Sequence, residues 1–352
     1  AFQEVRTAQR VAQTLDELQI EYSTGVAKTG IVAIIGEGTP RFALRADMDA
    51  LPILEANDVP YKSQNAGVMH ACGHDAHTTC LLGAAMILSE EFKKGNLKGS
   101  VKLLFQPAEE NWDAELKSGG RRMVEEGALK DVDAVVGLHV ISTLPSGEVH
   151  TSAGAFMAAV DSFEGDVIGR GGHGAYPHEA LDPIWLAAQV VTAIHGTISR
   201  LKHPAKLGLI SVTTIHAGTA TNVIPDSVRM SGTIRSFEED VRAQMHVDLE
   251  KAFALTRAFG GDYKLQIQRG YPPTVNDARM ADFVKAMARD LIGANWVKEA
   301  EIEMGAEDFS YMTLAKPGYP MMYTMDNSET ALGLDAAAAL ARSGERPMSI
   351  RY

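Results

Sequence analysis

Potential metal ligands are concentrated in the stretch Met69–Leu88, which reads MHACGHDAHTTCLLGAAMIL. Cys72 and His74 lie two residues apart beside a glycine, and an apolar run begins at Leu81. A thiolate and an imidazole in one tight turn suit zinc or another first-row metal ion. We expect a ligand-bearing loop that opens into a buried helix, whose N-terminus lowers the pKa of Cys72 and favours its thiolate. The alternative is a buried structural cysteine beside histidines that bind no metal.

Two further polar clusters follow predicted strands. Strand Ser100–Phe105 leads into Glu109 and Glu110, and strand Ala134–Val140 carries His139 near its end. Adjacent carboxylates after a buried strand are costly, because like charges at close range raise one pKa unless cations neutralise them. Two metal ions would neutralise them, so that one carboxylate coordinates while its neighbour accepts a proton from water. Taken alone, the two glutamates also fit a solvated turn.

The elements that must position these clusters alternate between helix and strand. An amphipathic helix is predicted at Phe2–Leu18, and two strands are predicted at Gly30–Gly36 and Arg41–Arg45. Asp47 and Asp49 follow the second strand, at the end where α/β sheets build their sites, although a turn with solvated carboxylates is the alternative. The alternation predicts a three-layer α/β domain with a largely parallel sheet.

The pattern changes after residue 153. Strands and helices are then predicted in the order β-α-β-β-α-β, at residues 156–168, 183–200, 207–216, 227–235, 238–259 and 263–269. This order is the ferredoxin-like split pattern. We therefore predict a ferredoxin-like α+β domain at residues 154–270, inserted into a metal-binding domain made of residues 1–153 and 271–352.

Six motifs give the chain a family resemblance: HACGHDAH, FQPAEE, GLHV, GRGGHGAYPH, TNVIP and MGAEDFS. From about Arg6 to Asp326 the chain resembles the M20 metallopeptidase family, in its branch of N-acyl-amino-acid amidohydrolases. That branch includes hippurate hydrolases, aminoacylases and auxin-conjugate hydrolases. The resemblance implies metal-dependent hydrolysis of the amide bond of N-acyl amino acids, or of short peptides with a free carboxylate. It also implies that the α/β domain is catalytic and that the inserted domain serves as lid and dimerisation surface.

The resemblance implies roles for individual residues of the catalytic domain. The implied metal ligands are Cys72, His74, Glu110 and His139, and Glu109 is the implied general base. Two divalent ions are implied, zinc above all, with manganese, cobalt and nickel as further options. In the implied mechanism Glu109 takes a proton from water that the metals activate, and it later passes a proton to the leaving amine.

Three residues of the inserted domain match positions that act on the substrate in the family: His173, Asn222 and Arg235. By the resemblance, His173 reaches the active site of a partner subunit and stabilises the oxyanion, while Asn222 and Arg235 bind the substrate. Arginine can bind a carboxylate through two hydrogen bonds. Without the resemblance, the three would be a surface loop residue, a turn former and a strand-end charge.

The segment GRGGHG, which contains His173, also matches the G-x-G-x-x-G spacing of a dinucleotide-binding loop. Pro177 and Pro183 interrupt the helix that such a loop requires. We therefore expect the glycines to bring His173 against a substrate, with dinucleotide binding as the alternative.

Composition limits the classes of partner. The net charge of −12 argues against a nucleic acid or an anionic membrane. No apolar run approaches the roughly 20 residues that span a bilayer. With only two cysteines, a disulfide scaffold is not expected and a reducing cytoplasm fits best.

The helix predicted at Pro183–Arg200 carries more apolar residues than one small sheet face needs. These residues are Ile184, Leu186, Ala187, Val190, Val191 and Ile194. Because two-fold homodimers are the commonest closed assembly, we expect a homodimer or a dimer-based oligomer.

One departure from the family pattern leaves a second class of function open. The family has a further metal-ligating histidine after the region that matches Pro320–Asn327, but this sequence has no histidine beyond His246. The alternative is a metal-poor relative that acts as a binding or scaffold protein. A third hypothesis, a cysteine hydrolase that uses Cys72, predicts inhibition by alkylation and indifference to chelators.

Overall fold

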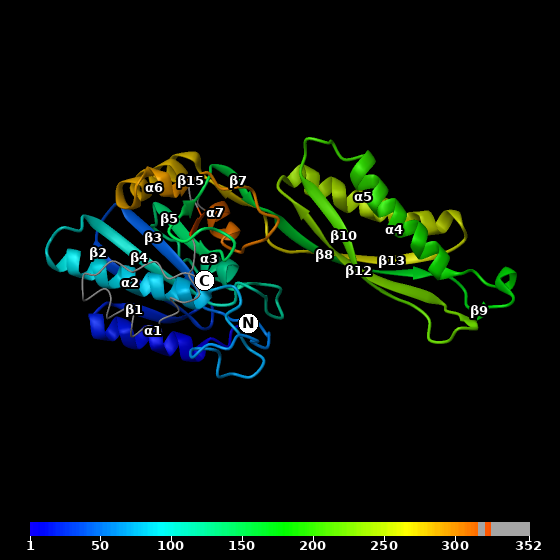
Figure 1. Ribbon diagram of the computed structural model, residues 1–352, viewed down its shortest axis with the longest axis horizontal. Helices are drawn as coiled ribbons and strands as arrows, with labels where there is room; N and C mark the ends of the chain where they lie inside the picture. The colour runs from blue at the N-terminus through cyan, green and yellow to red at the C-terminus, as the bar shows by residue number, and fades with distance from the viewer. Residues whose placement is uncertain (316–320, 325–352) are drawn as a thin grey trace. The chain divides into compact units, whose positions relative to one another are not determined.

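The structure, a computed structural model, describes residues 1–315 and 321–324. Its contacts divide the chain into two compact units (Figure 1). Unit 1 comprises Ala1–Phe156, Thr274–Glu301 and the chain from Asp308, and unit 2 comprises Met157–Pro273 and Ile302–Glu307. The predicted domain boundaries, with residues 154–270 inserted between 1–153 and 271–352, stay a prediction. Within the described ranges, no helix is both long enough and apolar enough to cross a membrane.

Unit 1 is built around an eight-stranded sheet with the strand order β1-β2-β4-β3-β5-β16-β6-β15. Its strands are β1 (Tyr22–Val26), β2 (Gly30–Glu37), β3 (Arg41–Asp47), β4 (Gly99–Gln106), β5 (Ala134–Val140), β6 (Val149–His150), β15 (Val297–Lys298) and β16 (Met321–Thr324). The central strands β4, β3, β5 and β16 are parallel. β1 is antiparallel to β2, β2 to β4 and β16 to β6.

The prediction of a largely parallel sheet therefore holds for the central strands and for β6 with β15, but it is wrong where β1 and β2 join the sheet and where β16 meets β6. A short turn joins Val26 to Gly30, so β1 and β2 pair in opposite directions, because parallel neighbours need a crossover of a dozen or more residues. The sheet is mixed, and the α/β class is confirmed.

Helices lie on both faces of the central strands. They are α1 (Val5–Leu18), α2 (His74–Lys93), α3 (Gly119–Glu125), α6 (Ala278–Ile292) and α7 (Ser310–Ala315). Side chains alternate along β3: Leu44 and Ala46 join a core with residues of α1 and α2, whereas Arg45 faces Phe309, next to α7. α3 contacts both β4 and α7, so it lies on the second face as well.

α2 begins earlier than predicted. We expected His74 in a loop, but it is the first residue of the helix, directly after Gly73, which has a φ of 79°. Leu81, Leu82 and Ala85 of α2 are buried in the core between the helix and the sheet. His74 is therefore held by a helix whose apolar face anchors it to the sheet.

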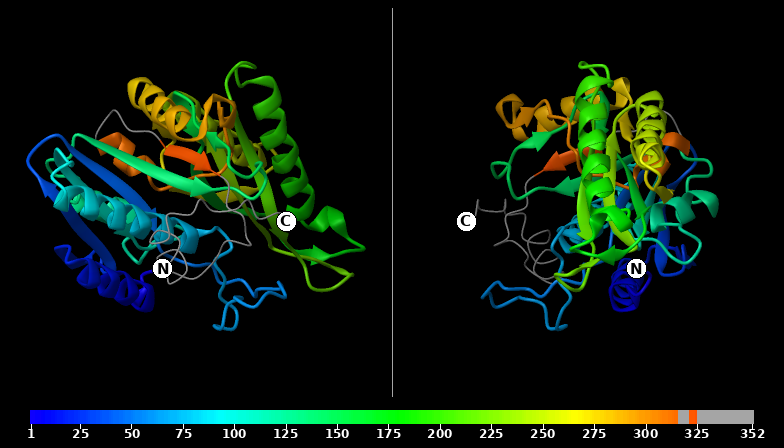
Figure 2. Two further views of the ribbon diagram at one scale, coloured as in Figure 1. Left: turned by 60° about the vertical axis from the view of Figure 1, so that its left-hand side comes forward. Right: turned by 90° about the vertical axis from the view of Figure 1, so that its right-hand side faces the viewer.

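Unit 2 contains a four-stranded antiparallel sheet with the order β10-β12-β8-β13. Its main elements are β8 (Ala159–Ile168), α4 (Pro183–Arg200), β10 (Gly208–His216), β12 (Ser227–Ser236), α5 (Glu239–Ala258) and β13 (Asp262–Arg269). Their chain order is the β-α-β-β-α-β order expected from the sequence. α4 and α5 lie side by side and share one apolar core with the sheet (Figure 2). A role for unit 2 as lid or dimerisation surface stays a prediction.

α4 has less exposed apolar surface than the sequence suggests. Of the six apolar residues named from the sequence, Leu186, Ala187, Val190 and Ile194 are buried in the core of unit 2, and Val191 packs against that core. These residues pack inside unit 2 and are not available to a partner, because they lie on the helix face toward the sheet. Only Ile184 stays largely exposed, at 48%, beside Trp185 at 46%. The expectation that this helix has spare apolar surface is therefore wrong for most of its length.

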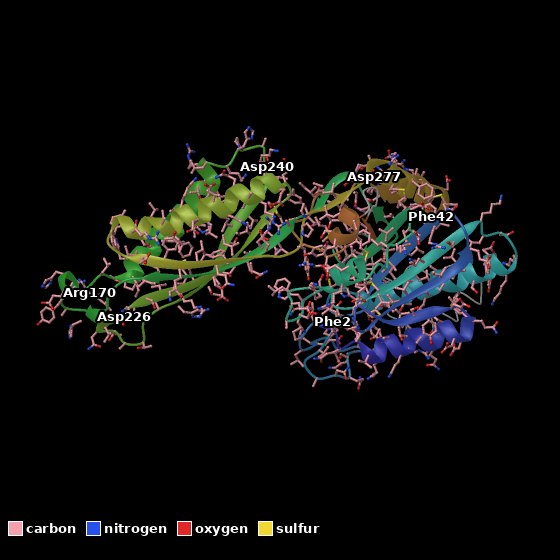
Figure 3. All side chains as sticks on the ribbon, turned by 180° about the vertical axis from the view of Figure 1, so that it is seen from behind. Phe2, Phe42, Arg170, Asp226, Asp240 and Asp277 are labelled. Atoms are coloured by element: carbon pink, nitrogen blue, oxygen red, sulfur yellow. The ribbon has the colours of Figure 1, made fainter. Side chains whose placement is uncertain are left out.

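The chain first leaves unit 1, and first returns to it, at the two strands of a short sheet. β7 (Gly154–Met157) pairs with β14 (Thr274–Asn276). α6 follows β14 at once, and Asp277, labelled in Figure 3, lies at its start. Asp277 caps the helix by accepting hydrogen bonds from the N–H groups of Arg279 and Met280. The stretch Met157–Pro273 of unit 2 therefore begins and ends at neighbouring strands.

Candidate metal centre

The candidate site lies at the carboxyl ends of three neighbouring parallel strands. β3 ends at Asp47, and β5 carries His139 near its end. The loop after β4 carries Glu109 and Glu110, and α2 presents His74 from its first turn. Because parallel strands end at the same edge of a sheet, residues far apart in the sequence meet there.

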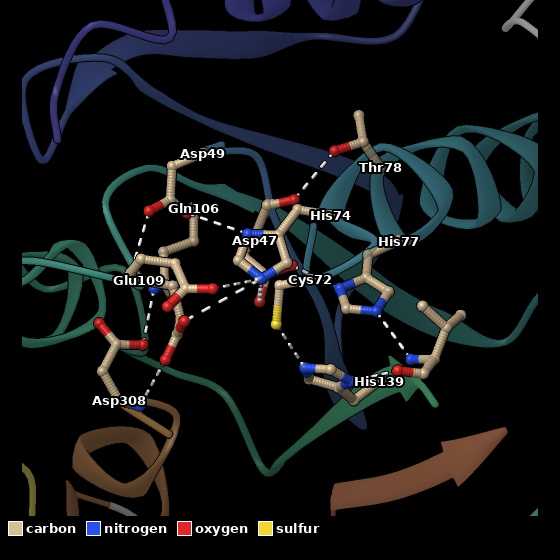
Figure 4. Close-up of polar contacts among 12 residues, drawn as sticks. Asp47, Asp49, Cys72, His74, His77, Thr78, Gln106, Glu109, His139 and Asp308 are labelled. Carbon is tan, nitrogen blue, oxygen red and sulfur yellow. Dashed lines mark hydrogen bonds and ion pairs between the residues drawn. The ribbon is translucent and has the colours of Figure 1, made fainter. Parts of the chain in front are cut away.

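Cys72, His74 and His139 form a first group of donors. One potential ligand atom from each lies within 4.8 Å of the others, and Cys72 Sγ is 3.5 Å from His139 Nε2 (Figure 4). A thiol with two imidazoles is a donor set that zinc binds in proteins.

His74, Glu109 and Glu110 form a second group within the same 4.8 Å limit. His74 Nε2 lies 4.0 Å from a carboxylate oxygen of each glutamate. That nitrogen is buried and has no hydrogen-bond partner among the described residues. An unsatisfied buried nitrogen facing two carboxylates is a costly arrangement, which a bound cation would relieve. The donors of the two groups, which share His74 Nε2, therefore fit the binding of divalent metal.

Asp49 orients His74. Its Oδ1 is 3.1 Å from His74 Nδ1, which donates because an ionised carboxylate can only accept. The other oxygen of Asp49 accepts the backbone N–H of Glu110 at 2.9 Å. This contact leaves Nε2 of His74 as the atom available for coordination, as expected of a carboxylate behind a metal-binding histidine.

His77 supports His139 through the peptide of Val140. The Val140 N–H donates to His77 Nε2 at 2.8 Å, so His77 carries its proton on Nδ1, which donates to Asp47. The Val140 carbonyl accepts the Nδ1–H of His139 at 2.6 Å, which leaves Nε2 of His139 for the donor cluster. The sequence did not predict a role for His77. Its three-residue spacing from His74 on one helix face was the available signal.

Local charges set the protonation of the two imidazoles. Burial lowers the pKa of His74, but nearby carboxylates, chiefly Asp47, raise it more, so that it lies well above its usual value. Burial, helped by the neighbouring His77, lowers the pKa of His139 to about 3. His139 is therefore neutral near pH 7 and able to coordinate, while the carboxylates around His74 favour a positive charge.

Cys72 differs from the expectation. Burial raises the pKa of its thiol, whereas His74 lowers it less. We expected the helix N-terminus to lower this pKa, but Cys72 lies two residues before the first residue of α2, and burial is the largest influence on its thiol. A thiolate at Cys72 needs a further positive charge, which a metal ion bound there would supply.

His173 and Asn222 lie side by side in unit 2. His173 belongs to β9 (Gly172–His173), which pairs with β11 (Val223–Ile224), and the N–H of Gly174 donates to the Asn222 carbonyl at 2.8 Å. Both side chains are exposed. Figure 3 shows Arg170 and Asp226 at this end of unit 2. Two of the three candidates in the inserted segment are thus brought together.

The glycine-rich segment at 169–174 does not open into a helix. β9 is followed by a single 3-10 turn at Pro177–Glu179, and α4 begins only at Pro183. A dinucleotide-binding loop places its phosphates at the N-terminus of the helix that follows it directly. The dinucleotide alternative is therefore wrong.

Arg235 lies near the end of β12, opposite Val160 of β8. Burial lowers its pKa, and the carboxylate of Asp161 raises it. Asp161 is itself ion-paired with Arg242 and lies 2.6 Å from His246 Nε2. The guanidinium of Arg235 makes no hydrogen bond to the residues described here, so it is available to an anion. The position expected for the additional family histidine lies outside the described residues.

The sequence matches peptidase family M20/M25/M40 over residues 43–341. It is 40% identical over 322 residues to IAA-amino acid hydrolase ILR1-like 2 of Arabidopsis thaliana. The alignment covers 90% of this chain and 72% of that protein. It is 42% identical over 323 residues to thermostable carboxypeptidase 2 of Saccharolobus solfataricus, with 90% and 80% covered. The Bacillus subtilis YXEP protein, a dinuclear metal binding peptidase from the M20 family, has a similar structure. The TM-score is 0.77 at 31% identity, over 97% of this chain and 90% of that one.

The family match spans most of the chain and contains every candidate site residue described above. The relatives are hydrolases and carboxypeptidases, which cleave C–N bonds. The chain is therefore an enzyme that hydrolyses C–N bonds, and it belongs to peptidase family M20/M25/M40.

Proposed function

We propose that the chain is a two-metal amidohydrolase that cleaves the amide bond of N-acyl amino acids or of short peptides with a free carboxylate. The observation that carries the proposal is the unsatisfied buried Nε2 of His74 between the thiol–imidazole group and the two glutamates. A hydrolase of IAA-amino acids and a carboxypeptidase both act beside an amino-acid carboxylate, and a dinuclear metal binding peptidase shares the fold.

Cys72, His74, Glu110 and His139 would hold the metal ions, with zinc first among the candidates. When bound, such ions polarise a carbonyl oxygen and lower the pKa of water. The mixed sulfur, nitrogen and oxygen donors also suit manganese, cobalt and nickel.

Glu109 acts as the general base and acid. Its carboxylate takes a proton from the attacking water and delivers a proton to the leaving amine, a role that suits a carboxylate beside the metal ligands. Its side chain is 6% exposed, against 24% for Glu110, so it is the more shielded of the pair.

Unit 2 supplies the groups that recognise the substrate. His173 of one subunit stabilises the oxyanion in the site of a partner subunit, and Asn222 and Arg235 bind the substrate, with the guanidinium on its carboxylate. Unit 2 then serves as lid and dimerisation surface of a cytoplasmic homodimer. The exposed side chains of His173 and Asn222, placed together on β9 and before β11, support this role.

The direct test is hydrolysis of hippurate and N-acetyl-methionine by the purified protein, with metal content measured alongside. We expect turnover that is lost in a chelator and restored by Zn²⁺, Mn²⁺ or Co²⁺. Turnover that resists chelation but stops on alkylation, in the wild type and in a Cys80→Ser variant alike, would identify Cys72 as a nucleophile instead.

A second candidate function is a metal-poor binding or scaffold protein, favoured by the absence of any histidine beyond His246. It predicts substoichiometric metal and no hydrolysis of either substrate. Near two metal ions per chain together with turnover would exclude it.

A further inference from the structure

Arg45 joins two parts of the candidate site. Its side chain is fully buried in β3, and its N–H groups bind three different acceptors. Nη1 is 2.6 Å from Asp47 Oδ2, Nη2 is 3.1 Å from Asp308 Oδ1, and Nε is 2.9 Å from Gln106 Oε1. The guanidinium also lies 5.8 Å from the centre of the Phe309 ring.

One arm of this network leads to the imidazoles. Asp47 accepts the Nδ1–H of His77, and His77 holds the Val140 peptide that orients His139. The Asp47 oxygen that binds the guanidinium is also 3.7 Å from His74 Nε2. A shift of Asp47 would therefore act on both imidazoles of the thiol–imidazole group.

The other arm leads to Glu109. Asp308 is buried, and its carboxylate accepts hydrogen bonds from Gln106 Nε2 and from the backbone N–H of Gly120, both at 2.7 Å. The backbone N–H of Asp308 donates to Glu109 Oε1 at 3.3 Å. A Cβ at Gly120 would lie 2.6 Å from Asp308 Oδ2, so the close contact needs glycine. The Asp308 carboxylate thus fixes the backbone group that holds Glu109.

We propose that Arg45 is a positioning residue that fixes the metal ligands and the general base relative to each other. For Glu109 this inference rests on the proposed function, whereas for the imidazoles it rests on the hydrogen bonds alone. Holding three acceptors in fixed directions requires arginine, because the planar guanidinium directs its donors along fixed axes, whereas the lysine ammonium is a single point charge.

Arg45→Lys tests the proposal, because it keeps the positive charge and removes the planar set of guanidinium donors. We expect the affinity of the full chain for Co²⁺ to fall about 10–100-fold, with an altered visible spectrum of the bound Co²⁺. We expect kcat to fall by a similar factor, while KM changes less than about threefold, since Arg45 touches no substrate. A purely structural role would lower the melting temperature without changing the spectrum.

Lys102→Arg is the matched control. Lys102 is a buried cation on the neighbouring strand β4, and its ammonium donates to the carbonyls of Ala128 and Lys130. It takes no part in the contacts of Arg45 described above, so exchanging its cation should leave Co²⁺ affinity, spectrum and kcat unchanged.

Two more variants separate the arms, and they decide the question even if Arg45→Lys does not fold. Asp308→Asn should lower kcat at unchanged Co²⁺ affinity, and His77→Gln should lower Co²⁺ affinity. The proposal is overturned if Arg45→Lys matches wild type in affinity, spectrum and kcat, or if Asp308→Asn and His77→Gln have the same profile. A wild-type protein that binds Co²⁺ but cleaves no amide contradicts the proposed function alone, because the Co²⁺ measurements still test the imidazole arm.

Discussion

Glu109 and Glu110 are neighbours in the sequence but have different surroundings. Glu109 Oε1 accepts a backbone N–H from Asp308, whereas the backbone of Glu110 is tied to Asp49, the residue that orients His74. Each glutamate is therefore linked to a different support. Such a difference allows one carboxylate to coordinate while the other exchanges protons.

We predict that Glu109→Gln abolishes turnover but leaves metal content nearly unchanged. The amide cannot accept the proton of water, and loss of a general base costs about 10²–10⁴-fold in kcat. Glu110→Ala should lose both metal and activity, because it removes a proposed ligand. The check is kcat with metal analysis on the same samples. Over half of wild-type kcat in Glu109→Gln, or full metal content in Glu110→Ala, would reverse the roles.

We predict that Arg235→Ala raises KM far more for substrates with a free α-carboxylate than for their amides. A charge-assisted bidentate pair contributes about 1.5–3 kcal/mol, or roughly 10–150-fold in affinity. Arg229→Ala is the control, because Arg229 lies exposed on the same strand and pairs with Glu164. Equal effects of Arg235→Ala on acids and amides would assign Arg235 to packing instead.

At the scale of elements, the start of α2 decides where Cys72 and His74 lie. Gly73 has a φ of 79°, and a Cβ there would meet Val140 Cγ2 at 2.3 Å. Val140 belongs to the strand that carries His139, so Gly73 allows the helix start to approach that strand closely.

We predict that Gly73→Ala lowers stability by on the order of 1–3 kcal/mol and weakens metal binding, because the helix start must move away from Val140. Gly83→Ala is the matched control inside the same helix, where a Cβ would meet nothing within 4 Å. It should raise stability by up to about 1 kcal/mol and leave the metal site intact. Denaturant unfolding and Co²⁺ titration check both. Undiminished metal affinity in Gly73→Ala would contradict the prediction.

A buried ion pair joins β8 to α5 in unit 2. Burial raises the pKa of Asp161, but Arg242 and His246 lower it more, so that it lies well below its usual value. A carboxylate whose pKa is lower in the folded than in the unfolded state stabilises the fold at pH values above the unfolded pKa of about 3.9. That stabilisation is lost as the pH falls toward the folded-state pKa.

We predict that Asp161→Asn costs about 3–5 kcal/mol of unfolding free energy at pH 7, because it leaves Arg242 buried without its carboxylate. The difference from wild type should shrink at pH 3, where the wild-type carboxyl begins to lose the advantage of its charge. Urea unfolding of both proteins at the two pH values measures it. A difference independent of pH would show that the charge of Asp161 does not stabilise unit 2.

The elements differ in how far the sequence predicts them. β5 and α4 have the predicted bounds, because each carries a clear apolar pattern between turn residues. The sequence also marks Cys72 and His74, since their spacing is local. It could not pair Arg45 with Asp308, because 263 residues separate them and only the fold brings them together. Short strands such as β6 and β15 likewise lack enough residues to form a pattern.

At the scale of the whole molecule, the homodimer stays a prediction. Most apolar residues of α4 serve the core of unit 2, which leaves Ile184 and Trp185 exposed. β10 is an edge strand of the sheet, and an unpaired edge is a template for pairing with another chain. The edge therefore supports the predicted homodimer better than α4 does.

We predict that inactive His173→Ala and inactive Glu109→Gln variants restore activity when their subunits exchange. In a mixed dimer, one site combines an intact Glu109 with an intact His173 from the partner, so up to half of the sites in each heterodimer should recover. Loss of one oxyanion donor costs about 10²–10³-fold in rate, so recovery is easily measured. No recovery after exchange confirmed by mass would mean that His173 acts within its own chain or not at all.

The pairing of β7 with β14 has a consequence for how such a protein can diversify. The two ends of the inserted stretch are neighbouring strands, which lie about 5 Å apart. Lengthening a stretch between two such ends adds only about 0.6 kcal/mol of closure free energy for each doubling of its length. Mutations within Met157–Pro273 can then accumulate without disturbing the strand that carries His139 or the helix that carries His74. We expect lineages of this family to have changed their substrates mainly by rewriting the inserted stretch, while the hydrolytic apparatus stayed the same.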